Sequence, residues 1–205
     1  MRGMMEFNIA LAGVGGQGTL LAAEAIGAAA VRDGLNVRVS EIHGMAQRGG
    51  AVFSSVRIGD AVFAPMILPG GADVLLGFEL LETLRNLVTA SEKTLVIVNS
   101  ARLIPPEVAV GKKEYPSIEE VCEKIRCFTR KVIIIDAEEL AGKAGSSLTQ
   151  NSVLLGALAA VQEFPVKDKS LLEALLELVP GRYAEVNVEA FKLGYASARA
   201  GQLLV

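Results

Sequence analysis

The chain has 205 residues, a length that suits one α/β domain and leaves little room for two. Hydrophobic residues make up 51% and charged residues 21%, which excludes an intrinsically disordered protein. The formal net charge of −3 provides no general basic field, so nucleic acid is not expected as a partner. The mean hydropathy of +0.42 is high for a lone soluble monomer and predicts that apolar surface meets a partner.

Targeting and metal signals are missing from the sequence. No apolar run approaches the roughly 20 residues that cross a bilayer, and the first residues do not lead into a secretory segment with a cleavage site. We therefore expect a cytoplasmic protein with no membrane contact. Cys122 and Cys127 have neither the C-x-x-C spacing nor that of an iron-sulfur or zinc motif, and His43 is the only histidine. No metal site is expected.

The chain is organised around a glycine-rich stretch near its start. An apolar run at residues 7–12 is followed by Gly13-Val14-Gly15-Gly16-Gln17-Gly18 and by a helix pattern at residues 19–33, which predicts a strand, a tight loop and a helix. Such a loop brings backbone N–H groups and the positive end of a helix dipole to an anion, so a phosphate is the expected ligand. The candidate binding residues here are Gly13, Gly15, Gly16, Gln17, Gly18 and Thr19.

Two side chains of this loop have more than one interpretation. The amide of Gln17 either binds a carbonyl of a ligand or partner, or ties the loop to itself. The hydroxyl of Thr19 either caps the helix or reaches a phosphate oxygen. A strand-to-helix turn with no ligand also fits the glycine pattern.

The second strand departs from the order of a dinucleotide-binding domain. Residues 36–40 form a strand pattern that ends at Glu41, about where such a domain places its ribose-binding acid. The next strand pattern, residues 51–58, begins too soon for a parallel crossover, which needs a dozen or more residues. We therefore expect this strand to run against at least one neighbour, with a further return strand at residues 61–63.

The residues between these two strands form a second candidate loop. Arg48 can grip a carboxylate or phosphate with two N–H groups, and Gly49 allows the backbone to approach the same anion. Glu41 either binds a ribose or neutralises Arg48, and Gln47 is a further binding candidate. His43 and Arg48 are the catalytic candidates, although no adjacent acid or nucleophile completes a pair with His43, which favours a structural role.

The remaining patterns alternate between strands and helices. Strands are expected at residues 73–78, 94–99 and 132–136, and helices at 79–88, 117–127, 150–164, 170–178 and 186–200, with an irregular stretch at 105–116. Ser117 with Glu120, and Ser170 with Glu173, have the order of a capping box. The fold class is α/β: one three-layer domain over residues 1–205 with a mixed, mainly parallel sheet, a Rossmann-like start and a helical C-terminal part from about residue 147.

The two loops are expected to lie side by side. Both follow the carboxyl ends of strands that we expect to be neighbours, and open α/β sheets bind ligands outside those ends. One cleft should then collect the glycine loop and the residues 43–50.

Taken together, the two loops resemble one enzyme family. Gly13-Val14-Gly15-Gly16-Gln17-Gly18 followed by Glu41-Ile42-His43-Gly44-Met45-Ala46-Gln47-Arg48-Gly49-Gly50 is similar to the gamma subunit or domain of the 2-oxoacid:ferredoxin oxidoreductases, and in particular to the small subunit of the indolepyruvate type. The likeness extends through Phe78-Glu79, Val98-Asn99, Asn151 and residues 187–194.

The resemblance implies an oxidoreductase that decarboxylates an arylpyruvate with coenzyme A to an acyl-CoA, carbon dioxide and reduced ferredoxin. Thiamine diphosphate and iron-sulfur clusters then belong to a large (alpha) partner subunit, ferredoxin is met through the complex, and coenzyme A is a substrate. This chain binds no cofactor alone and is inactive alone, although it can form a homodimer. Two rival interpretations are an NAD(P)-dependent dehydrogenase that uses the glycine loop and Glu41, and a nucleotide-sensing module without catalysis.

Overall fold

The computed structural model describes residues 6–44, 50–100 and 115–201, with the backbone alone for His43. Six strands form one sheet in the order β2-β3-β1-β4-β5-β6. β3 is antiparallel to both β1 and β2, and the pairs β1–β4, β4–β5 and β5–β6 are parallel. The predicted mixed, mainly parallel sheet and the reversed strand at 51–58 are therefore confirmed. The strands are β1 Glu6–Val14, β2 Val37–His43, β3 Ala51–Gly59, β4 Val74–Gly77, β5 Leu95–Asn99 and β6 Val132–Ile135.

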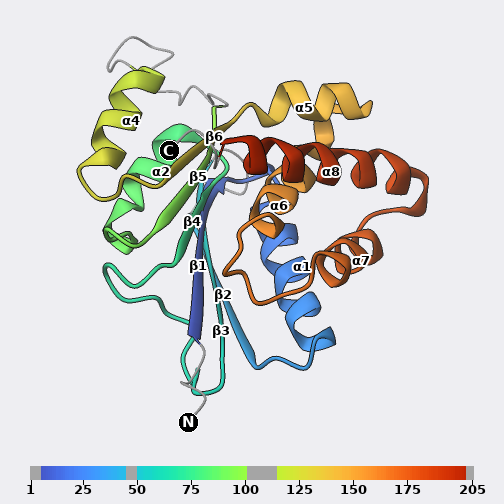
Figure 1. Cartoon of the computed structure of the whole chain (residues 1–205), viewed down its shortest axis with the longest axis horizontal. Coiled ribbons are helices and arrows are strands. Elements are labelled where there is room, and N and C mark those ends of the chain that lie inside the picture. Colours follow the sequence, from blue (N-terminus) through green and yellow to red (C-terminus); the bar gives the residue numbers. More distant parts are fainter. Residues whose placement is uncertain (1–5, 45–49, 101–114, 202–205) are drawn as a thin grey trace.

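Helices cover the sheet on both faces. Figure 1 shows the sheet nearly edge-on, with α1, α6, α7 and α8 on one side and α2 and α4 on the other, so the predicted three layers are present. The helices are α1 Thr19–Arg32, α2 Leu80–Arg85, α4 Ile118–Arg126, α5 Ala137–Ala144, α6 Gln150–Ala159, α7 Asp168–Leu178 and α8 Ala184–Gly201, with short 3-10 turns η1 Leu87–Thr89, η2 Ser147–Thr149 and η3 Gly181–Tyr183.

The alternation of side chains along β1 divides the core in two. Ile9 and Leu11 belong to the core cluster beneath α1 and α6, whereas Ala10 and Ala12 belong to the cluster beneath α2 and α4. Successive side chains of a strand point to opposite faces, so a strand that is buried on both faces must be apolar throughout. This is why β4 and β5 appear in the sequence as unbroken apolar runs.

The helical C-terminal part is held by a close contact between α6 and α8. A Cβ on Gly156 would lie 1.9 Å from the carbonyl oxygen of Phe191, and one on Gly194 would lie 1.9 Å from that of Val153. The two backbones can approach this closely only because both positions are glycine.

Several details of the sequence interpretation need correction. Residues 61–63 form no strand, and the helix expected at 79–88 ends at Arg85 before a 3-10 turn. The Ser117 capping box is confirmed, since its hydroxyl accepts the N–H of Glu120 and the Glu120 carboxylate accepts the N–H of Ser117. Ser170 instead lies inside α7, where its hydroxyl donates to Asp33 at 2.6 Å. Most of the stretch expected to be irregular, 105–116, lies outside the described residues.

Among the helices that the structure describes, none has the length and apolar character required to span a bilayer.

Candidate functional site

The glycine loop lies at the carboxyl end of β1, next to the carboxyl end of β4. A Cβ on Gly13 would come within 2.7 Å of Thr19 Oγ1 and 2.8 Å of the Cβ of Phe78. Gly16 and Gly18 have φ angles of 103° and 82°, in the left-handed region that glycine adopts without strain. The loop conformation therefore depends on the glycines themselves, whether or not an anion binds.

The amide of Gln17 ties this loop together. Its Oε1 accepts the N–H of Val14 at 2.8 Å, and its Nε2 donates to the carbonyl of Phe78 at 3.3 Å. Of the two interpretations of Gln17, these contacts support the structural one, with the addition that the tie reaches across to the end of β4.

Two of the loop's N–H groups are already engaged. The N–H of Gly15 donates to the carbonyl of Gly50 at 2.9 Å, and that of Gln17 donates to the carbonyl of Val14 at 3.1 Å. An anion at this loop would therefore have to use N–H groups nearer the start of α1.

Thr19 does not cap α1, and its contact with a phosphate stays a prediction. The residue before α1 is Gly18, and no side chain caps this helix. The Thr19 hydroxyl is shielded from solvent, and among the described residues nothing hydrogen-bonds to it. A ligand would reach this hydroxyl only after the loop moved.

The second loop meets the first through β3. The N–H of Gly44 donates to the carbonyl of Ala51 at 2.9 Å, and Gly50 bonds to Gly15 as described. The described ends of the two loops thus lie beside each other, although β1 and β2 are not neighbours, because the antiparallel β3 lies between them. Gln47, Arg48 and Gly49 lie outside the described residues, so their part in the cleft stays a prediction.

Glu41 does not occupy the position of a ribose-binding acid. It lies inside β2 opposite Ser54, and β3 separates β2 from β1. With strands spaced at about 4.8 Å, β2 lies roughly 10 Å from the strand that carries the glycine loop. In a dinucleotide-binding domain the acid's strand is the direct neighbour of β1. His43 is the last residue of β2, and only its backbone is described.

The structure also brings an amide cluster to this edge that residue-by-residue reasoning did not identify. Asn99, the last residue of β5, donates to the carbonyl of Phe78 at 3.2 Å and to Gln150 Oε1 at 3.2 Å, and accepts the N–H of Ala137 at 3.1 Å. The Asn151 side chain lies against Gly18, where an added Cβ would be 3.0 Å from its Nδ2. The sequence does carry a signal for this cluster, because polar residues stand at the end of a buried strand and at the start of an apolar helix.

A buried carboxylate completes this edge. Glu79, which is 1% exposed, directly follows Phe78 at the end of β4. Its carboxylate accepts the N–H of Glu82 at 2.9 Å, which caps α2, and the hydroxyl of Tyr115. The fixed position of Glu79 therefore depends on the helix that follows it.

The described residues hold no ligand set for a metal ion or cluster. They contain no group of three or more histidine, cysteine or acidic side chains that could bind a metal. Cys122 is buried in α4, where burial raises the pKa of its thiol, and Cys127 is exposed at the end of the same helix. A redox centre of the iron-sulfur type does not fit the residues of this part of the chain.

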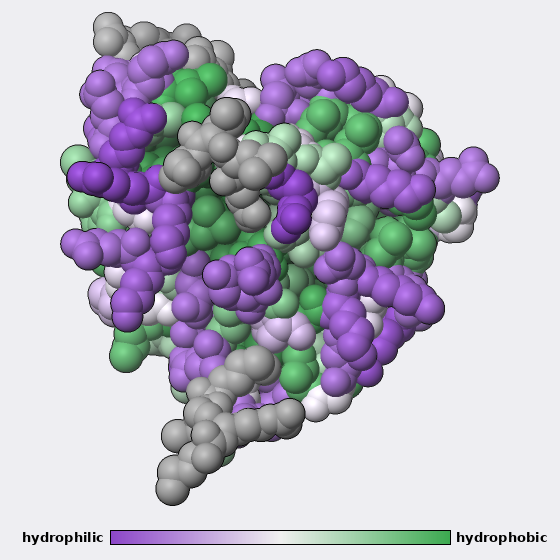
Figure 2. Space-filling view, viewed as in Figure 1, coloured by the Kyte–Doolittle hydropathy of each residue, from purple (hydrophilic) through white to green (hydrophobic). Residues whose placement is uncertain are grey.

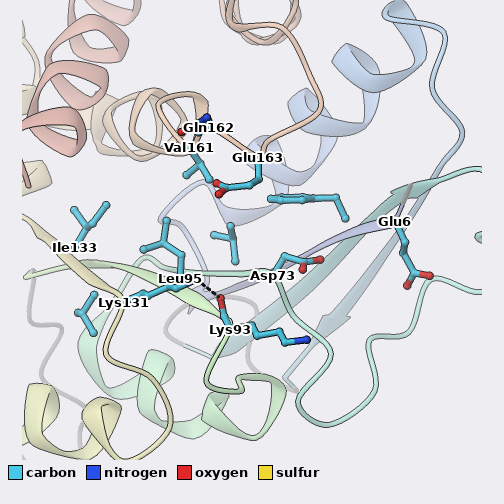
Figure 3. Close-up of a pocket in the computed structure, with 12 residues that line it drawn as sticks. Glu6, Asp73, Lys93, Leu95, Lys131, Ile133, Val161, Gln162 and Glu163 are labelled. Atoms are coloured by element: carbon cyan, nitrogen blue, oxygen red, sulfur yellow. Dashed lines mark hydrogen bonds between the residues drawn. The ribbon is translucent and has the colours of Figure 1, made fainter. Parts of the chain in front are cut away.

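A cavity of about 550 Å³ lies at the opposite edge of the sheet. Figure 3 shows it at the start of the parallel strands, where Leu95 and Val161 belong to an apolar lining and the charged groups of Asp73, Lys93 and Glu163 lie around it. Desolvation by burial raises the pKa of Asp73, which accepts the N–H of Asn8. This cavity is separate from the predicted site, which lies at the carboxyl ends of the same strands.

The fold and this edge define an α/β component with a self-tied glycine loop and no metal ligands among its described residues. The chain belongs to the family of pyruvate ferredoxin/flavodoxin oxidoreductases, whose family model matches residues 8–197. It is 43% identical over 198 residues to the indolepyruvate oxidoreductase subunit IorB of Archaeoglobus fulgidus, covering 97% of this chain and 98% of that protein.

More distant relatives agree with this assignment. The pyruvate/ketoisovalerate oxidoreductases common subunit gamma of Thermococcus kodakarensis is 29% identical over 185 residues, covering 87% of this chain and 89% of that protein. The solved gamma subunit of a keto/oxoacid ferredoxin oxidoreductase from Geobacter sulfurreducens is 26% identical, with a TM-score of 0.67 over 95% of this chain and 99% of that one. The predicted resemblance to subunits of 2-oxoacid:ferredoxin oxidoreductases is confirmed.

Proposed function

We propose that this chain is the small subunit of an arylpyruvate:ferredoxin oxidoreductase, with indolepyruvate as the substrate class. The observation that carries this proposal is the difference in identity between relatives. The chain is 43% identical to a subunit of an indolepyruvate oxidoreductase and 29% identical to a common gamma subunit of pyruvate and ketoisovalerate oxidoreductases.

In the proposed reaction, an arylpyruvate loses its carboxyl group as carbon dioxide. The remaining acyl carbon forms a thioester with coenzyme A, whose thiol releases a proton. The electron pair that this oxidation frees is passed to oxidised ferredoxin through the complex. Atoms and charge balance with no further oxidant.

This chain contributes structure and one wall of a cleft to that reaction. As the family resemblance implies, we assign thiamine diphosphate and iron-sulfur clusters to the large partner subunit. For the clusters this agrees with the described residues, which offer no metal ligand set, and with the spacing of the two cysteines. The carboxyl edge with the glycine loop, Glu79 and Asn99 is the part that we propose faces the cleft. A phosphate of coenzyme A or the carboxylate of the 2-oxoacid is the anion expected there.

The geometry disfavours the dehydrogenase alternative. The acid that should bind a ribose lies two strands away from the glycine loop, and the Gly15 N–H is bonded to Gly50. Calorimetry of the isolated chain with NAD and NADP should show no tight binding. Tight binding would restore the dehydrogenase or the nucleotide-sensing interpretation.

Co-expression with the cognate large subunit is the decisive experiment. We expect a stable complex that reduces ferredoxin only when indolepyruvate and coenzyme A are both supplied, with pyruvate and 2-oxoglutarate as poorer substrates. A complex that prefers pyruvate would contradict the substrate class, and the absence of any complex would contradict the subunit role.

A further inference from the structure

Of the helices that the structure describes, none lies over β2 and β3 on the face of the sheet opposite α1. The register places Ile42 opposite Phe53, and Arg38 opposite Arg57, on the face that points away from α1. Val39, between them, points to the other face, since a Cβ on Gly27 of α1 would lie 3.0 Å from it. Ile42 is 60% exposed although it is a large apolar residue in a strand.

The connection between β3 and β4 crosses this same face. The hydroxyl of Ser55 donates to the carbonyl of Pro65 at 2.7 Å, and the guanidinium of Arg57 donates to the carbonyls of Ala64 and Met66 at 2.8 and 3.2 Å. Figure 1 shows this connection, in teal, below α2 and α4 on the same side of the sheet. The segment is therefore fixed to the sheet by hydrogen bonds of its own backbone.

This fixed segment nevertheless presents large apolar side chains to solvent. Phe63 is 85% exposed, Met66 68% and Leu68 71%. No residue from Ala61 to Ala72 carries a charge. Figure 2 shows hydrophobic side chains at the lower left margin of the view, where this connection runs. A contiguous group of exposed apolar side chains marks an interaction site more often than scattered single ones do.

We propose that this apolar shelf, formed by Ile42, Phe53, Phe63, Met66 and Leu68, is the docking surface for the cofactor-carrying large subunit. This inference rests on the proposed function. The large subunit presents apolar side chains to the shelf and a carboxylate to Arg38. Arg38 is exposed, and its guanidinium bonds to the carbonyl of its own neighbour, Val37.

Charge on this face favours a different chain over a second copy. Arg38 and Arg57 lie side by side across two strands, and Glu6, the acid beside them, already pairs with Arg57. Arg57 is therefore neutralised and only 18% exposed, whereas the exposed Arg38 would meet a second Arg38 in a symmetric dimer centred here, where like charges disfavour association. A partner with a carboxylate at this position would meet both the apolar and the cationic part of the surface.

Continuity with the predicted site supports the same occupant. A stable interface buries roughly 800 Å² on each partner, more than one short connection provides. The surface must therefore continue along β2 and β3, whose paired ends reach Gly44, Ala51 and, through Gly50, the glycine loop. A subunit that covers the shelf is thereby brought to the edge where we place the cleft.

The test compares variants of the full chain co-expressed with the large subunit. Phe63→Ser combined with Met66→Ser should weaken the complex roughly tenfold or more, because central apolar anchors dominate interface energies. Val31→Ser is the matched control, since Val31 is 65% exposed near the end of α1, on the other face of the sheet and away from the carboxyl edge, and it should leave the dissociation constant within about twofold. Arg38→Glu should weaken the complex further at low salt than at high salt. All variants should unfold at the temperature of the wild type, because the side chains are exposed.

The outcomes separate this inference from the proposed function. If the wild-type complex forms and the Phe63→Ser, Met66→Ser variant binds equally well, the shelf is not the docking surface although the subunit role stands. If the variant abolishes self-association of the lone chain and leaves the large subunit bound, a second copy is the occupant and the proposal is wrong. If the wild type forms no complex, both fail together.

Discussion

The carbonyl of Gly50 accepts the N–H of Gly15 at 2.9 Å, and this single bond joins the two loops that the sequence marks as functional. It exists because β3 turns back beside β1, with Ala51 opposite Val14. The same bond removes a donor that a dinucleotide-binding loop would offer to a pyrophosphate. The glycine pattern therefore has a different use here from the one that its spacing first indicates.

Substituting Gly13 tests how rigid this loop is. In Gly13→Ala the new Cβ would lie 2.8 Å from the Cβ of Phe78, which is anchored to the backbone. We expect the free energy of unfolding to fall by about 1–3 kcal/mol, as for other overpacked sites. Urea denaturation of the isolated chain measures it.

Gly142→Ala is the control for that experiment. A Cβ on Gly142, inside α5, would meet nothing within 4 Å. Alanine in a helix interior is better than glycine by roughly 0.5–1 kcal/mol, so this variant should be slightly more stable than the wild type. If both variants change the free energy of unfolding equally, close packing at Gly13 does not determine the stability of the loop.

Gln17 gives a test between its structural and ligand-binding interpretations. In Gln17→Ala the N–H of Val14 loses its acceptor, which should cost about 1–3 kcal/mol of unfolding free energy. Gln17→Glu keeps an acceptor for Val14 but turns a carboxylate oxygen toward the carbonyl of Phe78, so it should destabilise the chain as well. Unchanged stability together with weaker binding of coenzyme A or 2-oxoacid in the reconstituted enzyme would instead assign Gln17 to the ligand.

Sequence reasoning succeeded where one residue pattern decides one element. Ser117 and Glu120 are capping partners that need no tertiary context. Residues 132–135 form a strand, as their run of β-branched residues predicts. The short distance from Glu41 to Ala51 excluded a parallel crossover and so predicted the reversed strand. These are local constraints, and tertiary packing does not override them.

The remaining features depend on neighbours that the sequence does not name. Ser170 has the order of a capping residue, yet its hydroxyl donates a hydrogen bond to Asp33, which is far away in the chain. Residues 61–63 have strand propensity. However, the carbonyls of Ala64 and Pro65, which follow them, accept hydrogen bonds from the side chains of Arg57 and Ser55, and no backbone pairing with β3 forms here. Asn99 became visible as part of the site only once β4, β5 and α6 were placed together.

The ion pair of Glu6 and Arg57 gives a pH-dependent prediction. The hydrogen bond from Arg57, joined by one from Asn8, lowers the pKa of Glu6 in the folded state. A carboxylate with a depressed folded pKa contributes stability above its unfolded pKa of about 4.3, and this is lost as the pH falls through the folded value. Because Glu6 is 43% exposed, the contribution is expected to be below about 1 kcal/mol.

Glu6→Gln should therefore be slightly less stable than the wild type near neutral pH and equal to it in acid. Urea denaturation of both proteins across this range measures the difference. Glu189→Gln, at an exposed position of α8, controls for the loss of a surface carboxylate. A difference that grows as the pH falls would contradict the assigned role of Arg57.

Arg48 provides the sharpest test of the proposed cleft. Its guanidinium is predicted from the sequence to bind a phosphate of coenzyme A or the carboxylate of the 2-oxoacid, and Gly50, at the described end of its loop, bonds to Gly15 of the glycine loop. Arg48→Ala should remove a charge-assisted contact worth about 1.5–3 kcal/mol and so weaken activity roughly tenfold or more. The thermal stability of the chain should not change.

The measurement is steady-state ferredoxin reduction by the reconstituted complex, with coenzyme A and indolepyruvate varied separately. A rise in KM for only one of them identifies the anion that Arg48 binds, and a fall in kcat alone assigns the arginine to the transition state. Arg130→Ala, an exposed arginine near the start of β6 and thus at the opposite edge of the sheet, is the matched control and should leave both constants unchanged. If Arg48→Ala also leaves turnover and both KM values unchanged, Arg48 is not part of the cleft, and the second loop does not serve ligand binding through this residue.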